Sequence, residues 1–381
     1  MPAQAYDVIV AGVGGMGSAT CWHLARQGQR VLGLERFDFG HVMGSSHGMT
    51  RIIRLAYFEG SQYVPLVKRA HQLWKETGEL AGTKLLHVTG SVDLAPEGAG
   101  FVESSRQSCL DHGLAHEMLD AREAMKRFPA FHLPAGHIGL WQADGGFIAS
   151  EKAIVAHVGL ARAKGADIRV NEPMLDWHPT ADGGVVVRTE KGTYSAGKLV
   201  IASGPWIEES VPELKQHVQP VRQCVAWYAV SKPELYTPER FPVFILTVDE
   251  GNLYGFPLYE HPGFKLGSPH FGREAIDPND PDRTPSEAQL KVMRESLKRY
   301  FPDADGEMLM VKGCIYTVTP DEHFLIDHVP GVPQALFVSA CSGHGYKFAS
   351  AIGEALADIC VAGKSQFDLS PFSLSRLTSA S

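Results

Sequence analysis

The sequence lacks the features of several protein classes. Its six cysteines among 381 residues are far apart and form no C-x-x-C pair, which argues against a disulfide framework and a zinc site. No apolar stretch approaches the length of about 18 residues that a membrane span needs. No run of Lys or Arg exceeds two residues, so nothing indicates a nucleic-acid groove or an anionic membrane as a partner. The histidines form no H-E-x-x-H pattern, and no bound metal is expected.

The remaining composition is that of an ordinary globular protein. Hydrophobic residues make up 44% of the chain, charged residues make up 20%, and the formal net charge is -8. A chain of this length usually divides into two domains. The first residues pass directly into an apolar run, without the charged segment of a secretion signal. A cytoplasmic protein without membrane or nucleic-acid partners is therefore the default expectation.

The start of the chain has the pattern of a nucleotide-binding unit. The apolar periodicity predicts a strand, a helix and a strand over residues 6–11, 18–27 and 31–35. Gly12, Gly14 and Gly17 follow the first strand in the spacing G-x-G-x-x-G, which lets the backbone approach a pyrophosphate at a helix N-terminus. Glu35 would accept hydrogen bonds from ribose hydroxyls. The motif predicts a dinucleotide and does not choose between NAD and FAD; a glycine-rich turn without a ligand is the alternative.

The rest of the chain predicts an interrupted α/β domain. Helical spacing recurs over 64–74, 151–164 and 349–361, and buried-strand runs recur over 198–204 and 336–340. Residues 216–315 instead alternate aromatic and β-branched segments with Pro and Gly, which favours an antiparallel or mixed sheet. We expect a two-domain α/β (α+β) fold. Its nucleotide-binding domain would contain residues 1–85, 150–215 and 315–381, and its substrate domain residues 86–149 and 216–314.

Two further segments carry possible anion-binding residues. Arg51 and Arg54 are three residues apart, so a helical turn would place both guanidinium groups on one side. They would bind a carboxylate or lie beside an electron-rich ring, or they are two surface arginines. Lys347, in a glycine-rich segment between a strand and a helix, would neutralise an anion. His344 in the same segment is either a functional or a structural histidine.

Single residues leave more alternatives open. Cys314 has Lys312 nearby, and a lysine can lower the pKa of a thiol; a lone cysteine is more often a small hydrophobic residue. Lys265 alternates with apolar residues on a predicted strand. It is a solvated edge lysine unless a ligand cavity lies beside it.

Three segments together resemble the monomeric sarcosine oxidase family of amine-oxidising flavoproteins, which includes N-methyltryptophan oxidase and pipecolate oxidase. These segments are GMTRIIR at 48–54, TPDEHF at 319–324 and SGHGYKF at 342–348. The resemblance extends over nearly the whole chain and is greatest to the sarcosine-oxidising members. It implies FAD, attached covalently by a thioether to Cys314. It also implies a monomer that oxidises a small secondary amino acid, with O₂ as acceptor and H₂O₂ as product.

The resemblance also implies residue roles. Arg54 and Lys347 would bind the substrate carboxylate, in a pocket lined by Tyr254, Ile245 and Phe256. The residues assigned to catalysis are Lys265, Arg51, Tyr254 and His344; among them, Lys265 would help O₂ accept an electron and Arg51 would lie against the flavin. With the glycine motif, the cofactor contacts are Gly12, Gly14, Gly17, Glu35, Arg36, Ser45, His47, Thr50, Cys314, Tyr316, Gly343, Gly345 and Lys347.

The implied reaction is hydride transfer from the carbon next to the amine nitrogen, followed by hydrolysis of the iminium. Sarcosine would give glycine and formaldehyde; N-methyltryptophan, pipecolate or proline, and glycated amino acids remain alternatives. Two departures from the family affect this choice. Ser46 replaces a second histidine before His47, and Pro269 stands where relatives have a pocket histidine, with His270 one position later.

Three other functions remain distinct possibilities. A flavin dehydrogenase would pass electrons to a quinone or a protein instead of O₂, and peroxide yield in air separates it from an oxidase. An NAD-dependent amine dehydrogenase would use the same glycine motif and would be colourless. A non-enzymatic nucleotide-binding module would show no flavin reduction by any secondary amine.

Overall fold

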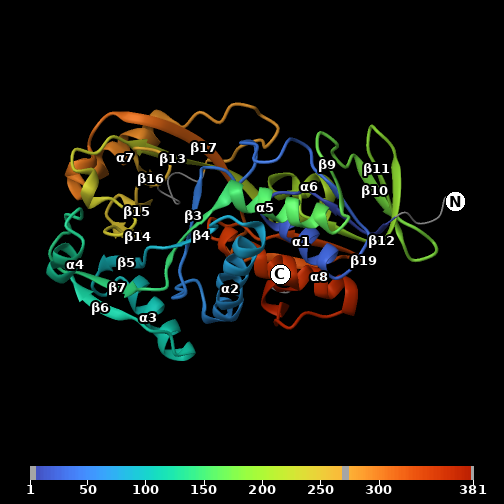
Figure 1. Ribbon diagram of the computed structural model, residues 1–381, viewed down its shortest axis with the longest axis horizontal. Helices are drawn as coiled ribbons and strands as arrows, with labels where there is room; N and C mark the ends of the chain where they lie inside the picture. The colour runs from blue at the N-terminus through green and yellow to red at the C-terminus, as the bar shows by residue number, and fades with distance from the viewer. Residues whose placement is uncertain (1–5, 268–273, 379–381) are drawn as a thin grey trace.

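The computed structural model describes residues 6–267 and 274–378, and Figure 1 shows how they are arranged. Two large sheets lie along the long axis of the molecule. Sheet I and its helices are on the right of Figure 1 and sheet II is on the left. Strands β3 (Thr50–Ile53) and β4 (Leu86–Val88) of the small sheet III lie between them. Pro269 and His270 lie outside the described residues.

Sheet I is built around parallel strands and contains the start of the chain. Its central order is β10-β11-β12-β1-β2-β9, and β19 pairs with β12 and with β18. Strand β1 pairs in parallel with β12 and β2, so its apolar run is buried between them. The bounds are β1 (Tyr6–Ala11), β2 (Val31–Leu34), β9 (Asp167–Arg169), β10 (Asp176–Pro179), β11 (Val185–Arg188), β12 (Thr193–Ile201), β18 (Leu325–Val329) and β19 (Val332–Ser339).

Helices cover sheet I and bury their apolar faces in one core. Helix α1 contacts α5 and α8, and α2 packs against α5 and α8 as well. These helices are α1 (Gly15–Arg26), α2 (Val64–Ala81), α5 (Ser150–Ala163) and α8 (Ala349–Ala362). A second core on the same sheet includes Ile207 of α6 (Ile207–Ser210) and Leu214 of η3 (Pro212–Leu214), and Leu377 of α9 (Ser375–Thr378) packs against it. The short helix η2 (Gly204–Trp206) directly precedes α6.

Sheet II is mostly antiparallel and contains one parallel pair, between β14 and β5. Its order is β17-β13-β16-β15-β14-β5-β7-β6. The bounds are β5 (Ser91–Pro96), β6 (Glu117–Asp120), β7 (His137–Gln142), β13 (Gln219–Tyr228), β14 (Val243–Val248), β15 (Gly251–Phe256), β16 (Phe264–Gly267) and β17 (Met308–Val318). One face packs on a phenylalanine-rich core with α4 (Ala121–Arg127) and α7 (Glu287–Tyr300). Each of these helices begins with a capping box.

Sheet III connects the two large sheets. It contains β3 (Thr50–Ile53), β4 (Leu86–Val88) and β8 (Gly146–Ala149), in the order β3-β8-β4. The remaining elements are α3 (Phe101–His112), η1 (Ser61–Tyr63), η4 (Pro233–Leu235), η5 (Pro302–Ala304), η6 (Tyr346–Phe348) and η7 (Ser370–Phe372).

The predicted fold class is confirmed, and local boundaries differ. The first helix begins at Gly15, three residues earlier than predicted, because the glycine turn itself leads into the helix. The segment around Arg51 does not form the helical turn that would place both arginines on one side, since Thr50–Ile53 is strand β3 and pairs with β8. Within residues 6–267 and 274–378, no helix has both the length and the apolar character needed to cross a membrane.

Candidate active site

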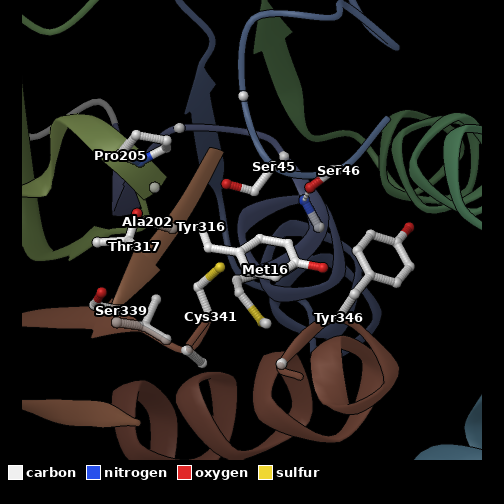
Figure 2. Close-up of a pocket in the computed structure, with 18 of the residues that line it drawn as sticks. Met16, Ser45, Ser46, Ala202, Pro205, Tyr316, Thr317, Ser339, Cys341 and Tyr346 are labelled. Carbon is white, nitrogen blue, oxygen red and sulfur yellow. Dashed lines mark hydrogen bonds between the residues drawn. The ribbon is translucent and has the colours of Figure 1, made fainter. Parts of the chain in front are cut away.

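One continuous cavity reaches from the glycine turn of sheet I to the β14–β15 hairpin of sheet II. Its wall includes the turn itself, the end of β2, residues 44–46, β3 and its flank, and the segment between β19 and η6. Figure 2 shows the part lined by Met16, Ser45, Tyr316 and Tyr346. Residues separated by more than 300 positions in the sequence therefore form one site.

At one end of the cavity, the glycines have three different environments. Gly12 has φ +90, and any Cβ there would overlap the backbone of Ala202. A Cβ at Gly17 would overlap the carbonyl oxygen of Gly12, so the turn packs tightly against the helix. A Cβ at Gly14 would have nothing nearer than the Ser46 hydroxyl oxygen at 3.7 Å, which leaves this side of the turn open to a ligand. This is the geometry that a pyrophosphate needs.

Glu35 lies in the same end of the cavity, at the carboxyl end of β2. Its two carboxylate oxygens accept the backbone N–H groups of Val13 at 2.8 Å and Phe37 at 3.0 Å. These bonds hold the carboxylate next to the glycine turn. Arg36 also lines this end, where its guanidinium donates to Asn279 and lies 5.2 Å from the ring centroid of Trp206.

Several buried hydroxyl groups in the cavity wall have no hydrogen-bond partner within the described residues. They belong to Ser45, Ser203, Thr317 and Ser339. Buried polar atoms are normally paired, so these groups point to a polar ligand along the cavity. Together with the open side of Gly14 and the position of Glu35, they fit FAD.

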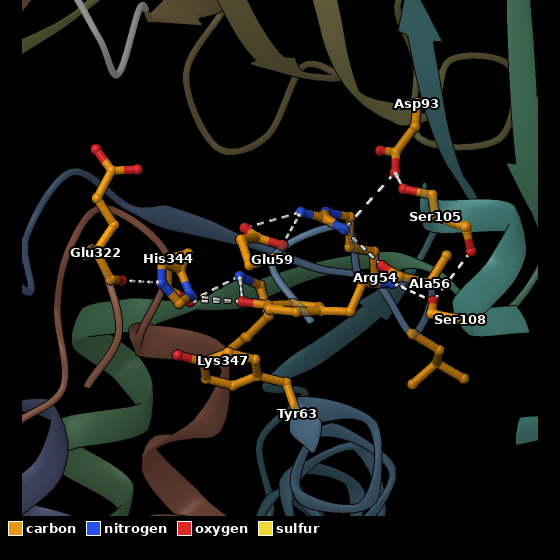
Figure 3. A network of polar contacts seen from close by, with 12 residues as sticks. Arg54, Ala56, Glu59, Tyr63, Asp93, Ser105, Ser108, Glu322, His344 and Lys347 are labelled. Carbon is orange, nitrogen blue, oxygen red and sulfur yellow. Dashed lines mark hydrogen bonds and ion pairs between the residues drawn. The ribbon is translucent and has the colours of Figure 1, made fainter. Parts of the chain in front are cut away.

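The other end of the cavity contains a buried arginine between two carboxylates (Figure 3). Arg54 follows β3 and is 2% exposed. It donates to both carboxylate oxygens of Glu59 at 3.1 and 3.0 Å, and its Nη1 lies 3.6 Å from Asp93. Burial works to raise the pKa of Glu59, but Arg54, His344 and Lys347 outweigh it, so the pKa lies below its usual range. Arg54 and Glu59 line the cavity, whereas Asp93 lies outside its wall.

A second cation lies close to Arg54. Lys347 donates from Nζ to the carbonyl oxygen of His344 at 2.7 Å and to the Tyr57 hydroxyl at 3.3 Å. The Tyr57 hydroxyl lies 2.7 Å from His344 Nδ1, and His344 Nε2 lies 3.0 Å from the carbonyl oxygen of Glu322. Because that carbonyl only accepts, Nε2 carries the proton and Nδ1 accepts from Tyr57. Burial, with a smaller contribution from Arg54, lowers the pKa of Lys347 to about 7.

Lys265 is not the solvated edge lysine that spacing alone would favour. It lies on β16 and is 2% exposed, and it donates to the carbonyl oxygens of Gly48 and Thr50 at 2.7 and 2.9 Å and to the Thr50 hydroxyl at 3.0 Å. Its ammonium also lies 4.2 Å from the ring centroid of Phe256. Burial, followed by Arg51, lowers the pKa of Lys265 well below its usual range. Lys265, Thr50 and Phe256 lie behind the cavity wall.

Arg51 and Arg54 both line the cavity, although they lie on and after a strand and not on a helical turn. Arg51 lies on β3 and donates to the carbonyl oxygens of Thr50 at 2.9 Å and Ser45 at 2.8 Å, whereas Arg54 follows the end of the strand. The guanidinium carbon of Arg51 is 6.0 Å from the ring centroid of Tyr346. The strand ends between the two arginines, and this is how both reach the same cavity.

Cys314 lies on β17 and is buried. Of the two alternatives for this cysteine, its surroundings match a buried hydrophobic position and not a thiol with a lowered pKa. Burial raises the pKa of its thiol to about 11, although Arg51 and Lys265 act in the opposite direction. Cys314 is not part of the cavity wall, whereas Cys341 is. His47 is also buried behind the wall, and neither of its ring nitrogens has a partner among the described residues.

The β14–β15 hairpin supplies another part of the cavity wall. Ile245 and Tyr254 are cross-strand partners and both line the cavity. The Tyr254 hydroxyl lies 3.3 Å from the hydroxyl of Tyr316 on β17. Gly343 has φ +81, and a Cβ there would lie 2.9 Å from the Tyr316 ring, so this glycine allows the ring to pack. Gly343 and Gly345 line the cavity with His344.

Sequence reasoning missed four residues of this site: Tyr57, Glu59, Asp93 and Glu151. Asp93 had a usable signal, because an acid within the apolar strand SVDLAP is buried and then needs a partner. Tyr57 and Glu59 lie in the loop before η1, where nothing local distinguishes them. Glu151 resembles an ordinary acid in the first turn of a helix.

Comparisons with known proteins agree with this geometry. Residues 7–359 match the family described as DAO, FAD dependent oxidoreductase. The chain is 37% identical over 379 residues to the monomeric sarcosine oxidase of Bacillus sp. (strain NS-129), covering 97% of each chain. It is 38% identical over 377 residues to the N-methyl-L-tryptophan oxidase of Salmonella typhimurium, covering 98% of this chain and 99% of the relative.

The fold also matches a solved structure. NikD, an unusual amino acid oxidase essential for nikkomycin biosynthesis, superposes with a TM-score of 0.85 at 26% identity, covering 97% of this chain and 98% of NikD. Because the match covers 97% of this chain, it includes both large sheets. The chain therefore belongs to the FAD dependent oxidoreductase family and, with the sarcosine and N-methyltryptophan oxidases, is a two-domain flavin-dependent amine oxidase.

Proposed function

We propose that this enzyme oxidises a secondary N-methyl amino acid, with sarcosine as its first candidate substrate. The observation that carries the proposal is the pair of buried cations, Arg54 and Lys347, in the same cavity as the glycine turn and Glu35. A carboxylate in a buried pocket needs a fixed cation, and this pair supplies two. The reaction would convert sarcosine, O₂ and water to glycine, formaldehyde and H₂O₂.

FAD, when bound, supplies the hydride acceptor that no side chain provides. The residues that would hold it are the glycine turn and Glu35 at the nucleotide end, and Arg51, Tyr316 and the 343–345 segment further along the cavity. Arg54 and Lys347 would orient the substrate by its carboxylate. Tyr254 and Ile245 would exclude water from the reacting carbon.

Lys265 is the cation proposed to favour electron transfer to O₂. An ammonium near the position where O₂ becomes negatively charged stabilises that charge, most strongly where water is excluded. Lys265 is nearly unexposed and lies beside Gly48, close to Arg51. The thioether between FAD and Cys314 is also proposed. Burial raises the pKa of the Cys314 thiol to about 11, and Arg51 and Lys265, which act in the opposite direction, would favour the thiolate that this bond requires.

The domain boundaries at 85, 149, 215 and 314, a monomeric state and a cytoplasmic location stay predictions. The alternatives for the substrate are N-methyltryptophan, pipecolate or proline, and glycated amino acids. The similarity to N-methyl-L-tryptophan oxidases is the observation that supports the first of these.

Peroxide release from this panel of amines tests the proposal. We expect sarcosine to give the highest kcat/KM, with equimolar H₂O₂ and formaldehyde. A higher kcat/KM for N-methyltryptophan would move the assignment to that substrate, and amine oxidation without peroxide would exclude an oxidase. Acid precipitation tests the covalent bond: yellow colour should remain in the pellet of the wild-type protein and be lost from that of Cys314→Ala.

A further inference from the structure

Glu151, the second residue of α5, faces the turn before β3. Its Oε1 accepts the backbone N–H of Gly48 at 2.7 Å and that of Met49 at 3.1 Å. Its Oε2 accepts the N–H of Met49 at 3.0 Å and the hydroxyl of Ser150 at 2.7 Å. In return, the N–H of Ser150 donates to the carbonyl oxygen of Met49 at 3.0 Å. The start of α5 and the turn are therefore joined by hydrogen bonds that each of them donates to the other.

The backbone conformation of this turn directs the N–H groups of Gly48 and Met49 toward one negative charge. Gly48 has φ +102 and Met49 has φ +72, and the second value is costly for a residue that is not glycine. Consecutive backbone N–H groups that converge in this way form a concave site for a negative charge. Burial acts to raise the pKa of Glu151, but Ser150, the turn amides and Arg51 outweigh it, so the pKa is lowered and the carboxylate is charged at neutral pH.

The opposite side of the same turn holds Lys265. Its ammonium donates to the carbonyl oxygens of Gly48 and Thr50. The Gly48 carbonyl and the Met49 N–H belong to one planar peptide unit and point in opposite directions. When Glu151 fixes the direction of that N–H, it also fixes the direction of the carbonyl that holds Lys265.

Glu151 also influences the charge of Lys265. Within the described residues, no carboxylate forms an ion pair with Lys265, whose hydrogen-bond partners are all neutral oxygens. Burial and Arg51 lower the pKa of Lys265, and Glu151 is the carboxylate that acts in the opposite direction. Geometry and charge therefore both connect Glu151 to this lysine.

We propose that Glu151 is a positioning residue for Lys265: by fixing the Gly48–Met49 peptide, it fixes the Gly48 carbonyl oxygen that holds the Lys265 ammonium in place. This inference rests on the oxygen-activating role proposed for Lys265. Glu151 lies outside the cavity wall.

The experiment compares wild-type holoenzyme with Glu151→Gln, in which the amide keeps one acceptor oxygen but loses the charge. The rate of reoxidation by O₂ should fall roughly tenfold, while anaerobic reduction by saturating sarcosine should stay within about twofold. A second readout does not depend on activity. In protein labelled with ¹³C-lysine, the Lys265 ε-carbon signal, assigned by its loss in Lys265→Met, should titrate at lower pH by about one pH unit.

Glu123→Gln is the matched control, because Glu123 also accepts a backbone N–H at a helix start, that of Asp120, but lies in α4. It should change neither readout. If Glu151→Gln folds poorly, Met49→Gly in the same chain relieves the strained φ, and the O₂ defect should persist there. Equal slowing of both half-reactions, or an unchanged Lys265 titration, would overturn the inference. Wild-type protein that no secondary amine reduces would instead contradict the proposed function, and the titration would still test the link between Glu151 and Lys265.

Discussion

The two ends of the cavity differ in how they meet their ligands. At the nucleotide end, the glycine turn brings the backbone to the cavity wall, and Glu35 is held by backbone N–H groups. At the other end, Arg54, Glu59, Asp93 and Lys347 place four charged side chains in one buried network. The first end would recognise the cofactor by shape and close backbone approach, whereas the second would recognise the substrate by charge. Substitutions at the two ends should therefore have different effects. Those at the nucleotide end should lower cofactor content, and those at the charged end should lower substrate affinity.

The largest effect is expected from Arg54→Met. This change removes the cation that holds the substrate carboxylate and leaves Glu59 and Asp93 without their main partner. The KM for sarcosine should rise about 100-fold, since losing one partner of a buried charge pair has this scale. Steady-state peroxide assays measure it, with the flavin absorbance as a control for cofactor content. An unchanged KM would show that the carboxylate binds elsewhere.

Gly12→Ala and Gly14→Ala test the nucleotide end as a pair. At Gly12 the new Cβ would overlap Ala202 and meet a positive φ, so folding should be destabilised by roughly 1–3 kcal/mol. At Gly14 the Cβ has space within the protein, so the chain should keep its stability and retain less FAD. Urea unfolding and the flavin-to-protein absorbance ratio distinguish the two. Equal FAD content in wild type and Gly14→Ala would contradict the proposed pyrophosphate position.

The charged end should respond to pH in a way that the nucleotide end does not. Burial lowers the pKa of Lys347 to about 7. Its ammonium is therefore present below pH 7 and is lost as the pH rises through that value, so carboxylate binding should weaken in the same range. Acetate, which has no amine to titrate, is the probe, and its Kd comes from the perturbed flavin spectrum. Lys347→Met should remove this pH dependence; a similar profile in that variant would assign it to another group.

The smallest expected effect is that of Tyr57→Phe. The variant loses the hydroxyl that joins Lys347 to His344 but retains both cations. One hydrogen bond of this kind corresponds to roughly a fivefold rise in the KM for sarcosine, with little change in kcat. A change as large as that of Arg54→Met would show that the tyrosine, instead of the cations, organises this end.

The sequence predicts the nucleotide end better than the charged end, for a physical reason. The glycine turn, the flanking strands and Glu35 lie within about 30 residues, the usual size of one βαβ unit, so local pattern determines their geometry. The structure confirms strand β1 with the predicted bounds. The charged end instead joins the residue after β3, strand β5 and the short helix η6, and their proximity depends on packing across the whole chain.

Two residues whose surroundings the sequence does not reveal show the same limit. Lys265 has the spacing of an edge lysine, yet the turn at Gly48, more than 200 positions away, supplies its hydrogen-bond acceptors. Cys314 has a lysine nearby in sequence, but burial dominates its pKa and raises it. In both cases the deciding contacts come from residues that no local window contains.

Anaerobic titration of the purified protein with sarcosine tests the central claim most directly, namely that one cavity joins a flavin site to a carboxylate-binding site. We predict that sarcosine bleaches the flavin absorbance of the wild-type protein and that Arg54→Met, with the same flavin content, needs about 100-fold more of it. Full flavin content with no bleaching by sarcosine or any other secondary amino acid would contradict the account.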